Sequence, residues 1–180
     1  MGNVDMTANE AFMGKYSTLS LDFIRETPLF YSEDIKFPLS TKGARIVDAT
    51  GRRVKLAGGN WSGGHMCRHC VDGLECRPLR DLAKDIKYKF HMNCIRLTYS
   101  LQLFFDNNKV PNKYLTANPE LIGKTSMEIF DYTIKILTEE GIMVILNNHT
   151  STSQWCCSND DGDGLWWSYQ YPENMFFECA

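Results

Sequence analysis

The sequence has no long hydrophobic run: no stretch of 18 or more apolar residues occurs in its 180 residues. We therefore expect no membrane-spanning helix. Charge of one sign is not in excess either, because 19 Lys and Arg are interspersed with 22 Asp and Glu, giving a net charge of -3. That balance provides no basic surface for nucleic acid. We expect no nucleic-acid partner.

We also expect no secretory signal, since residues 1–10 are polar and no basic stretch leads into an apolar core. The seven cysteines point the other way, because loop cysteines favour an oxidising compartment. The localisation therefore stays open, as does the disulfide pairing. Cys94 lies inside an apolar run and is interpreted as a small buried hydrophobic residue.

Residues 1–38 are weakly patterned, and prolines interrupt any longer element, which predicts an N-terminal extension or linker. The ordered domain is expected over residues 39–180. Its first feature is a pair of strand-like runs, Arg45–Val47 and Arg53–Leu56, on either side of the turn-rich tetrapeptide 48–51. The second run continues to Trp61 through glycines that permit close approach to other backbone.

Two amphipathic helices and two more strands follow this first strand. The first helix is predicted by apolar residues spaced three or four apart: Leu79, Leu82, Ala83, Ile86 and Phe90. The second is predicted by Met127, Phe130, Ile134 and Leu137, with Gly141 at its C-terminal cap. Apolar strands are expected at 92–99 and 142–146. Such alternation indicates a parallel sheet covered by helices.

An open doubly wound sheet and a barrel both satisfy this order. The first strand ends in residues 58–64, which do not form the G-x-G-x-x-G phosphate turn of an open dinucleotide-binding sheet. Bulky polar and aromatic residues at all three strand ends favour a barrel instead. The predicted fold class is α/β: the N-terminal part of a parallel (β/α)8 barrel, with about three of its strands.

Polar and aromatic side chains lie at the end of each predicted strand: Asn60 and Trp61, Arg96 and Tyr99, and Asn148 and His149. The C-terminal ends of parallel barrel strands converge on one pocket, so we expect these side chains to be neighbours. Trp155 follows in the next loop, and its flat ring suits stacking on a sugar. The alternative is that these residues are capped, paired or packed for structural reasons.

Several segments in register resemble glycoside hydrolase family 5, the cellulase family, over about residues 39–172. They are Leu39–Asp48, Val54–Trp61, Asn93–Ser100 and Val144–His149, followed by Trp155–Asn159. The resemblance implies a (β/α)8 barrel that hydrolyses O-glycosyl bonds of β-glycans with retention. It implies a polysaccharide or oligosaccharide substrate, no cofactor, no metal and an extracellular location.

The resemblance also implies residue roles. Arg96 matches the arginine that holds the nucleophilic carboxylate, and His149 matches a histidine that contacts the sugar at the cleavage point. Asn60, Trp61, Tyr99, Asn148 and Trp155 are expected to bind substrate. Both catalytic carboxylates of the family are glutamates, after the fourth and seventh strands, so neither is expected within this chain, and the 180 residues alone are expected to be inactive.

Two other functions remain open. A degenerate, non-catalytic barrel fragment would bind carbohydrate without cleaving it. A metal-dependent module would be centred on Cys67 and Cys70, although a second ligand pair at zinc-site spacing is missing. The acidic stretch 159–164 resembles the start of a calcium loop but has Gln170 where Glu is required, which favours a flexible acidic loop.

Overall fold

The computed structural model describes residues 29–30, 32–155, 160–163 and 167–178. The chain divides into two compact units, the first holding residues 34–55 and Leu29, the second holding Phe30 and the residues from Leu56 onward. A short 3-10 helix, η1 (Ser32–Asp34), lies at their junction in the sequence. Among the described residues, no helix is long and apolar enough to span a bilayer.

The first unit is built on a small antiparallel sheet and one buried carboxylate. Strand β1 (Ser40–Lys42) pairs with β2 (Arg45–Val47), and the predicted turn at 48–51 follows β2. The Asp48 carboxylate accepts hydrogen bonds from the Thr50 hydroxyl and from the backbone N–H groups of Lys36, Thr50 and Arg52. These bonds, that of the Thr50 hydroxyl foremost, lower the pKa of Asp48 to about 2.

The prediction of a strand at Arg53–Leu56 is wrong. Residues 53–56 form only isolated bridges, Val47 with Arg53 and Leu29 with Val54, and the main partner of β2 is β1. The strand of the larger sheet begins at Gly58 instead, in the second unit. Local pattern cannot distinguish these pairings, because a short apolar run satisfies either partner.

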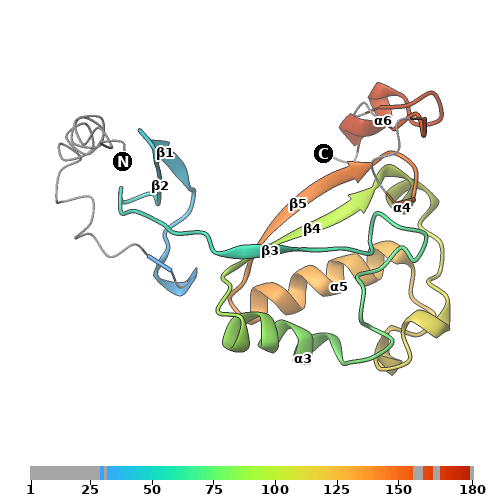
Figure 1. Cartoon of the computed structure of the whole chain (residues 1–180), viewed down its shortest axis with the longest axis horizontal. Helices are drawn as coiled ribbons and strands as arrows, with labels where there is room; N and C mark the ends of the chain where they lie inside the picture. The colour runs from blue at the N-terminus through green and yellow to red at the C-terminus, as the bar shows by residue number, and fades with distance from the viewer. Residues whose placement is uncertain (1–28, 31, 156–159, 164–166, 179–180) are drawn as a thin grey trace, which may run out of the picture. The chain divides into compact units, whose positions relative to one another are not determined.

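The second unit contains a parallel three-stranded sheet in the order β3-β4-β5 (Figure 1). Its strands are β3 (Gly58–Trp61), β4 (Cys94–Ser100) and β5 (Met143–Thr150). Glycine is required at the start of β3, because a Cβ on Gly58 would lie 2.2 Å from the Cys94 carbonyl oxygen. The predicted parallel sheet is confirmed.

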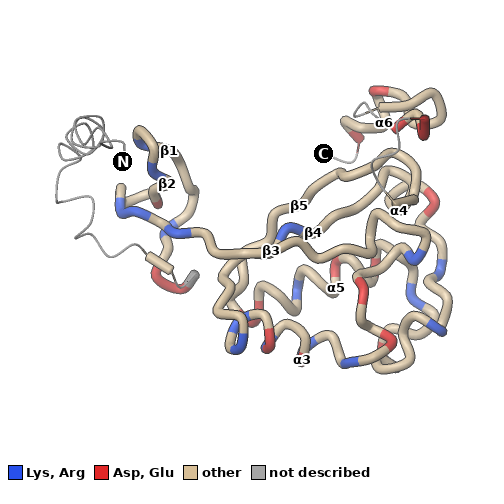
Figure 2. The backbone as a smooth tube through the Cα atoms, viewed as in Figure 1, with Lys and Arg blue, Asp and Glu red and all other residues tan. Residues whose placement is uncertain are grey.

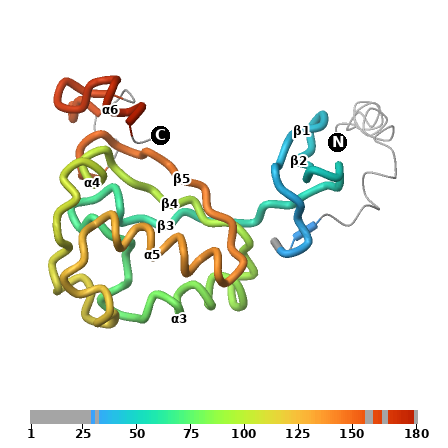
Figure 3. Tube along the Cα trace, turned by 180° about the vertical axis from the view of Figure 1, so that it is seen from behind, coloured from blue at the N-terminus to red at the C-terminus, as the bar shows by residue number. Residues whose placement is uncertain are grey.

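Helices α3 (Leu79–Lys84) and α5 (Ser126–Glu139) lie together on one face of this sheet, as two opposite views show (Figures 1 and 3). Thr125 caps α5 through a reciprocal capping box with Glu128, and Gly141 follows the helix with φ of 72°. The shorter elements are α4 (Leu101–Asp106), η3 (Asn112–Tyr114), η4 (Pro119–Leu121) and α6 (Glu173–Glu178).

The prediction that Phe90 lies on the apolar face of the first helix is wrong. Phe90 is 64% exposed, whereas Leu79 and Ala83 are buried. The reason is that α3 continues into a π-helical turn, η2 (Asp85–Lys89), which changes the phase of the side chains that follow. The 3.6-residue period therefore fails at the end of the helix.

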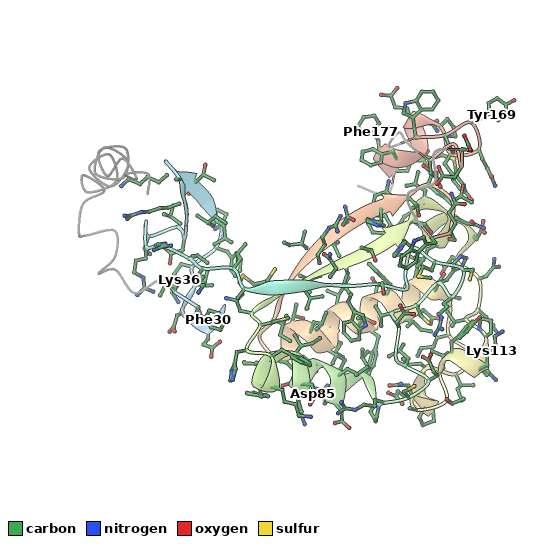
Figure 4. The ribbon with its side chains drawn as sticks, in the orientation of Figure 1. Phe30, Lys36, Asp85, Lys113, Tyr169 and Phe177 are labelled. Carbon is green, nitrogen blue, oxygen red and sulfur yellow. The ribbon has the colours of Figure 1, made fainter. Side chains whose placement is uncertain are left out.

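The hydrophobic core lies between this sheet and the two helices. Side chains fill the layer, and Asp85 lies at its outer side near the end of α3 (Figure 4). Both acidic and basic residues occur along each of the two helices (Figure 2). The fully buried members include Leu79, Leu97, Ile129 and Leu137. Cys94 is 5% exposed, which confirms its interpretation as a buried hydrophobic residue.

The edge position of β5 generates a prediction for amide hydrogen exchange. The Met143 amide donates to the carbonyl of Asn93, the residue before β4. Because successive amides of a strand point to opposite edges, those of Ile145 and Asn147 also face β4. Those of Val144 and Leu146 face an edge where no strand of the described chain pairs. We expect Val144 and Leu146 to exchange faster than Ile145 and Asn147, measured by NMR on the 180-residue chain.

The amides of residues 94–97 in β4 provide the internal control, because this part of β4 is paired along both edges and should exchange slowly at every position. Equal, slow exchange at all four β5 amides would show that β5 is a central strand and would contradict this topology.

Candidate active site

The side chains predicted from the strand ends divide between the two faces of the sheet. Register pairs Asn60 with Arg96 and Arg96 with Ile145, and paired residues in neighbouring strands point to the same face. These three residues help to line an open hollow of about 260 Å³ on the face opposite α3 and α5. We call this the open face, and the side that carries the two helices the helix face.

Arg96 is the central charge on the open face. Its Nη1 donates to Asn60 Oδ1 at 3.3 Å, and its Nη2 lies 3.5 Å from His149 Nδ1. In the part of the chain that the structure describes, no carboxylate forms an ion pair with Arg96. The groups beside the guanidinium are therefore neutral, and its donors remain suited to an incoming carboxylate.

Hydrogen bonding determines which nitrogen of His149 carries the proton. The Asn147 side-chain amide donates to the Asn148 carbonyl at 3.1 Å, which leaves Asn147 Oδ1 facing His149 Nδ1 at 3.1 Å. Because that oxygen can only accept, and because this contact is shorter than the 3.5 Å contact with Arg96, it favours a hydrogen on His149 Nδ1 and the lone pair on Nε2. Arg96 then forms no hydrogen bond with Nδ1, since both groups are donors, and it acts on the ring through its charge.

A second imidazole lies beside the first. His65 is 4% exposed, its Nδ1 lies 2.8 Å from the Thr98 hydroxyl, and its ring centroid is 4.6 Å from that of His149. Gly64 permits this approach, because a Cβ there would lie 2.4 Å from the Thr98 carbonyl oxygen. His65 was not predicted to belong to this group, although the glycine pair before it is the signal of a close turn.

Three of the predicted side chains are not brought to this group. Trp61 packs against the core and donates its Nε1 hydrogen to the Asp72 carbonyl at 2.9 Å. The Tyr99 ring packs edge-on against Phe130 of α5, with centroids 6.0 Å apart. Asn148 is opposite Tyr99 in the register, and its Oδ1 is buried without a hydrogen-bond partner among the described residues.

The physical reason for all three corrections is the two-residue period of a strand. Sequence analysis assigned these side chains by their position at a strand end, yet neighbouring residues point to opposite faces. Trp61 and Asn148 therefore point away from the face of Asn60 and His149. The residue beside His149 on the open face is Asn147, which sequence analysis missed.

The loop after β5 carries the remaining aromatic candidates. Trp155 is 73% exposed and Trp167 41% exposed, while Trp166 lies outside the described residues. Tyr169 and Phe177 are also exposed (Figure 4). The Asp163 carboxylate accepts hydrogen bonds from the backbone of residues 151 and 152 and from the Gln154 side chain, so it holds this loop.

The cysteines of the loop after β3 differ in exposure. Cys67 and Cys76 are exposed, whereas Cys70 is buried, and all three are free thiols. Burial raises the pKa of the Cys70 thiol to about 12, so this side chain is a neutral thiol. Among the described residues, no three His, Cys, Asp or Glu side chains lie close enough together to hold a metal ion.

The two site imidazoles are held in the neutral form. For His149, burial lowers the pKa first and the positive charge of Arg96 lowers it further. For His65, burial again acts first, then His149 and Arg96, against an opposing effect of Asp72. The site therefore combines a permanent cation with two uncharged rings.

Comparison with known proteins is consistent with this geometry. A family model described as Cellulase (glycosyl hydrolase family 5) matches residues 47–178. A glycosyl hydrolase 5 family protein from Chamaecyparis obtusa is 35% identical over 158 residues, covering 78% of this chain and 28% of that protein. An endoglucanase from Paenibacillus polymyxa is 33% identical over 136 residues, covering 76% and 32%. The chain spans less than a third of the length of these two curated relatives.

Solved structures match the fold. The catalytic domain of the major endoglucanase of Xanthomonas campestris pv. campestris has a TM-score of 0.65 and 25% identity, covering 77% of this chain and 38% of that one. A complex of a variant Pyrococcus horikoshii endocellulase with cellotetraose has a TM-score of 0.65 and 26% identity, covering 80% and 38%. The predicted partial barrel is thereby confirmed.

The neutral imidazoles generate a prediction about pH. The folded-state pKa values of His65 and His149 lie below the ordinary value of 6.5, so the unfolded chain binds more protons as the pH falls. The free energy of unfolding should therefore decrease as the pH falls below about 6.5. Replacing Arg96 with Met should raise the pKa of His149, measured by NMR titration.

Arg80→Met is the matched control, because Arg80 pairs with Glu139 and Glu140 on the exposed helix face and should leave the His149 titration unchanged. An unchanged His149 pKa in Arg96→Met would show that Arg96 does not act on the ring.

Proposed function

Because this chain belongs to the cellulase family, glycosyl hydrolase family 5, we propose that it supplies the carboxylate-positioning half of a β-glucan hydrolase site. The substrate class is a β-linked glucan, as the cellotetraose complex of the Pyrococcus horikoshii endocellulase suggests. The observation that carries the proposal is the Arg96 guanidinium, which lies on the open face between Asn60 and His149 without a carboxylate among the described residues.

Arg96 is suited to hold a nucleophilic carboxylate in the ionised state. A guanidinium is planar, remains charged at any working pH and pairs with a carboxylate through two parallel hydrogen bonds. Asn60 accepts one hydrogen bond of 3.3 Å from Nη1, which leaves the other donors of the guanidinium available. Pairing would lower the pKa of the incoming carboxyl and keep it nucleophilic.

His149 is suited to contact the sugar. Its Nδ1 hydrogen is directed to Asn147 Oδ1, so its neutral Nε2 can accept a hydrogen bond from a sugar hydroxyl. The neutral form matters, because an imidazolium would have no acceptor. Trp155 offers an exposed ring in the following loop, and such a ring can stack on a pyranose.

The reaction itself needs two carboxyl groups. Retaining hydrolysis requires a general acid and a nucleophile about 5 Å apart, on either side of the scissile bond. Neither role can be filled by Arg96, which does not release a proton, and Asp163 is occupied in holding its loop. We propose that two glutamates from other strands of the complete barrel provide both groups.

The first test of this function compares two proteins. The 180-residue chain expressed alone should not hydrolyse carboxymethylcellulose, because the proposal places the carboxyl pair on other strands. A chimera in which it is continued by the remaining strands and helices of the Paenibacillus polymyxa endoglucanase should do so. Arg96→Ala in the chimera should then reduce kcat by about 100-fold or more, the usual effect of removing one group that stabilises charge in a transition state.

Arg80→Ala in the same chimera is the control, since Arg80 pairs with Glu139 and Glu140 on the side of the sheet that carries the helices, away from the open face. Hydrolysis by the short chain that survives Arg96→Ala would show that the chemistry lies elsewhere. Binding of cellotetraose by a folded chimera without any turnover would favour the non-catalytic carbohydrate-binding alternative.

A further inference from the structure

The buried imidazole of His65 has no role in the site described so far. Only 4% of this residue is exposed, and a buried titratable ring requires a reason for its retention. Its ring meets that of His149 at a centroid distance of 4.6 Å and an angle of 70°, an edge-to-face contact. His65 thus lies directly behind the residue proposed to contact the sugar.

The proton on His65 is fixed by a chain of hydrogen bonds. The Thr98 hydroxyl donates its single hydrogen to the Trp61 carbonyl at 3.2 Å. The Thr98 oxygen must therefore accept at its 2.8 Å contact with His65, so His65 Nδ1 carries the hydrogen. The carbonyl of β3, the hydroxyl of β4 and the ring form one directed relay.

The backbone of His65 is anchored as well. Its carbonyl accepts from the backbone N–H of Gln154 at 3.1 Å and from the Thr150 hydroxyl at 3.4 Å. Gly63 and Gly64 let the turn before it lie against other backbone, since a Cβ at either position would come within 2.4 Å of a carbonyl oxygen. Through these contacts His65 is linked to β3, β4 and β5.

We propose that His65 is a positioning residue, which braces the His149 ring from behind so that its Nε2 is presented to the substrate as an acceptor. The Thr98 relay holds one side of the brace, and Asn147 directs the His149 Nδ1 hydrogen from the other side. The inference rests on the proposed function insofar as His149 contacts a sugar, but the brace itself is a property of the free chain.

The test is an NMR measurement on the 180-residue chain, without substrate. Long-range proton–nitrogen correlation distinguishes the imidazole tautomers of its four histidines. We expect the Nδ1–H tautomer for both His65 and His149. Thr98→Val, which removes the hydroxyl at nearly constant shape, should abolish the tautomer preference of His65 and shift the His149 ring signals. Thr98→Ser should restore both.

Thr133→Val is the matched control, because Thr133 is also fully buried and its hydroxyl bonds only to the Ile129 carbonyl within α5. It should leave both rings unchanged. His65→Asn separates the two parts of the brace, since its amide can keep the bond to Thr98 while the ring contact is lost. We expect it to shift the His149 signals as Thr98→Val does.

The proposal is overturned if His149 keeps its wild-type signals in both Thr98→Val and His65→Asn, or if wild-type His65 carries its hydrogen on Nε2. Neither result depends on glucan hydrolysis, so a failure of the brace is distinguishable from a failure of the proposed function. Loss of Arg96-dependent hydrolysis with intact tautomers would overturn only the latter.

Discussion

The parallel pairing of β4 with a strand on each side is the constraint on which the rest of the structure depends. It sets Arg96 opposite Asn60 on one side and opposite Ile145 on the other. Because side chains alternate along a strand, this register also decides what lies behind the site: Leu97 is part of the core beneath the helices, and Trp61, paired with it, packs against that core. A slip of one residue would exchange the two faces, placing a guanidinium in the core and leucines in the hollow.

Close approach of the strands adds a second condition, which explains the glycines. Gly58 lies against the carbonyl of Cys94 and Gly64 against that of Thr98, at distances that leave no room for a Cβ. The first brings β3 into register with Arg96, and the second lays the following turn against β4. The position of His65 is therefore a consequence of backbone packing, and its hydrogen bond to Thr98 then fixes the ring.

Elements with strong local periodicity could be predicted from the sequence, and features that depend on facing or distant pairing could not. Helix α5 was predictable because its apolar spacing and Gly141 agree with the observed cap. Tyr99 was assigned to the wrong face because the prediction placed every polar or aromatic side chain of a strand end in one pocket, although only alternate residues share a face. His65 was missed because its role depends on Thr98, 33 residues away in the sequence. The pairing of β1 with β2 likewise depends on a partner that an apolar run does not specify.

The electrostatics of the open face follow from what it contains. A guanidinium that has neutral neighbours on both sides repels further positive charge, and this lowers the pKa of both imidazoles in addition to the effect of their burial. An incoming carboxylate would reverse that influence, since it would offset the charge of Arg96 and favour protonation of His149. The hydrogen bond from Nδ1 to Asn147 keeps the lone pair on Nε2 while the ring is neutral. Protonation of the ring would remove that acceptor. A buried ring behind His149 keeps water from that side, so the neutral state is retained best when the brace is in place.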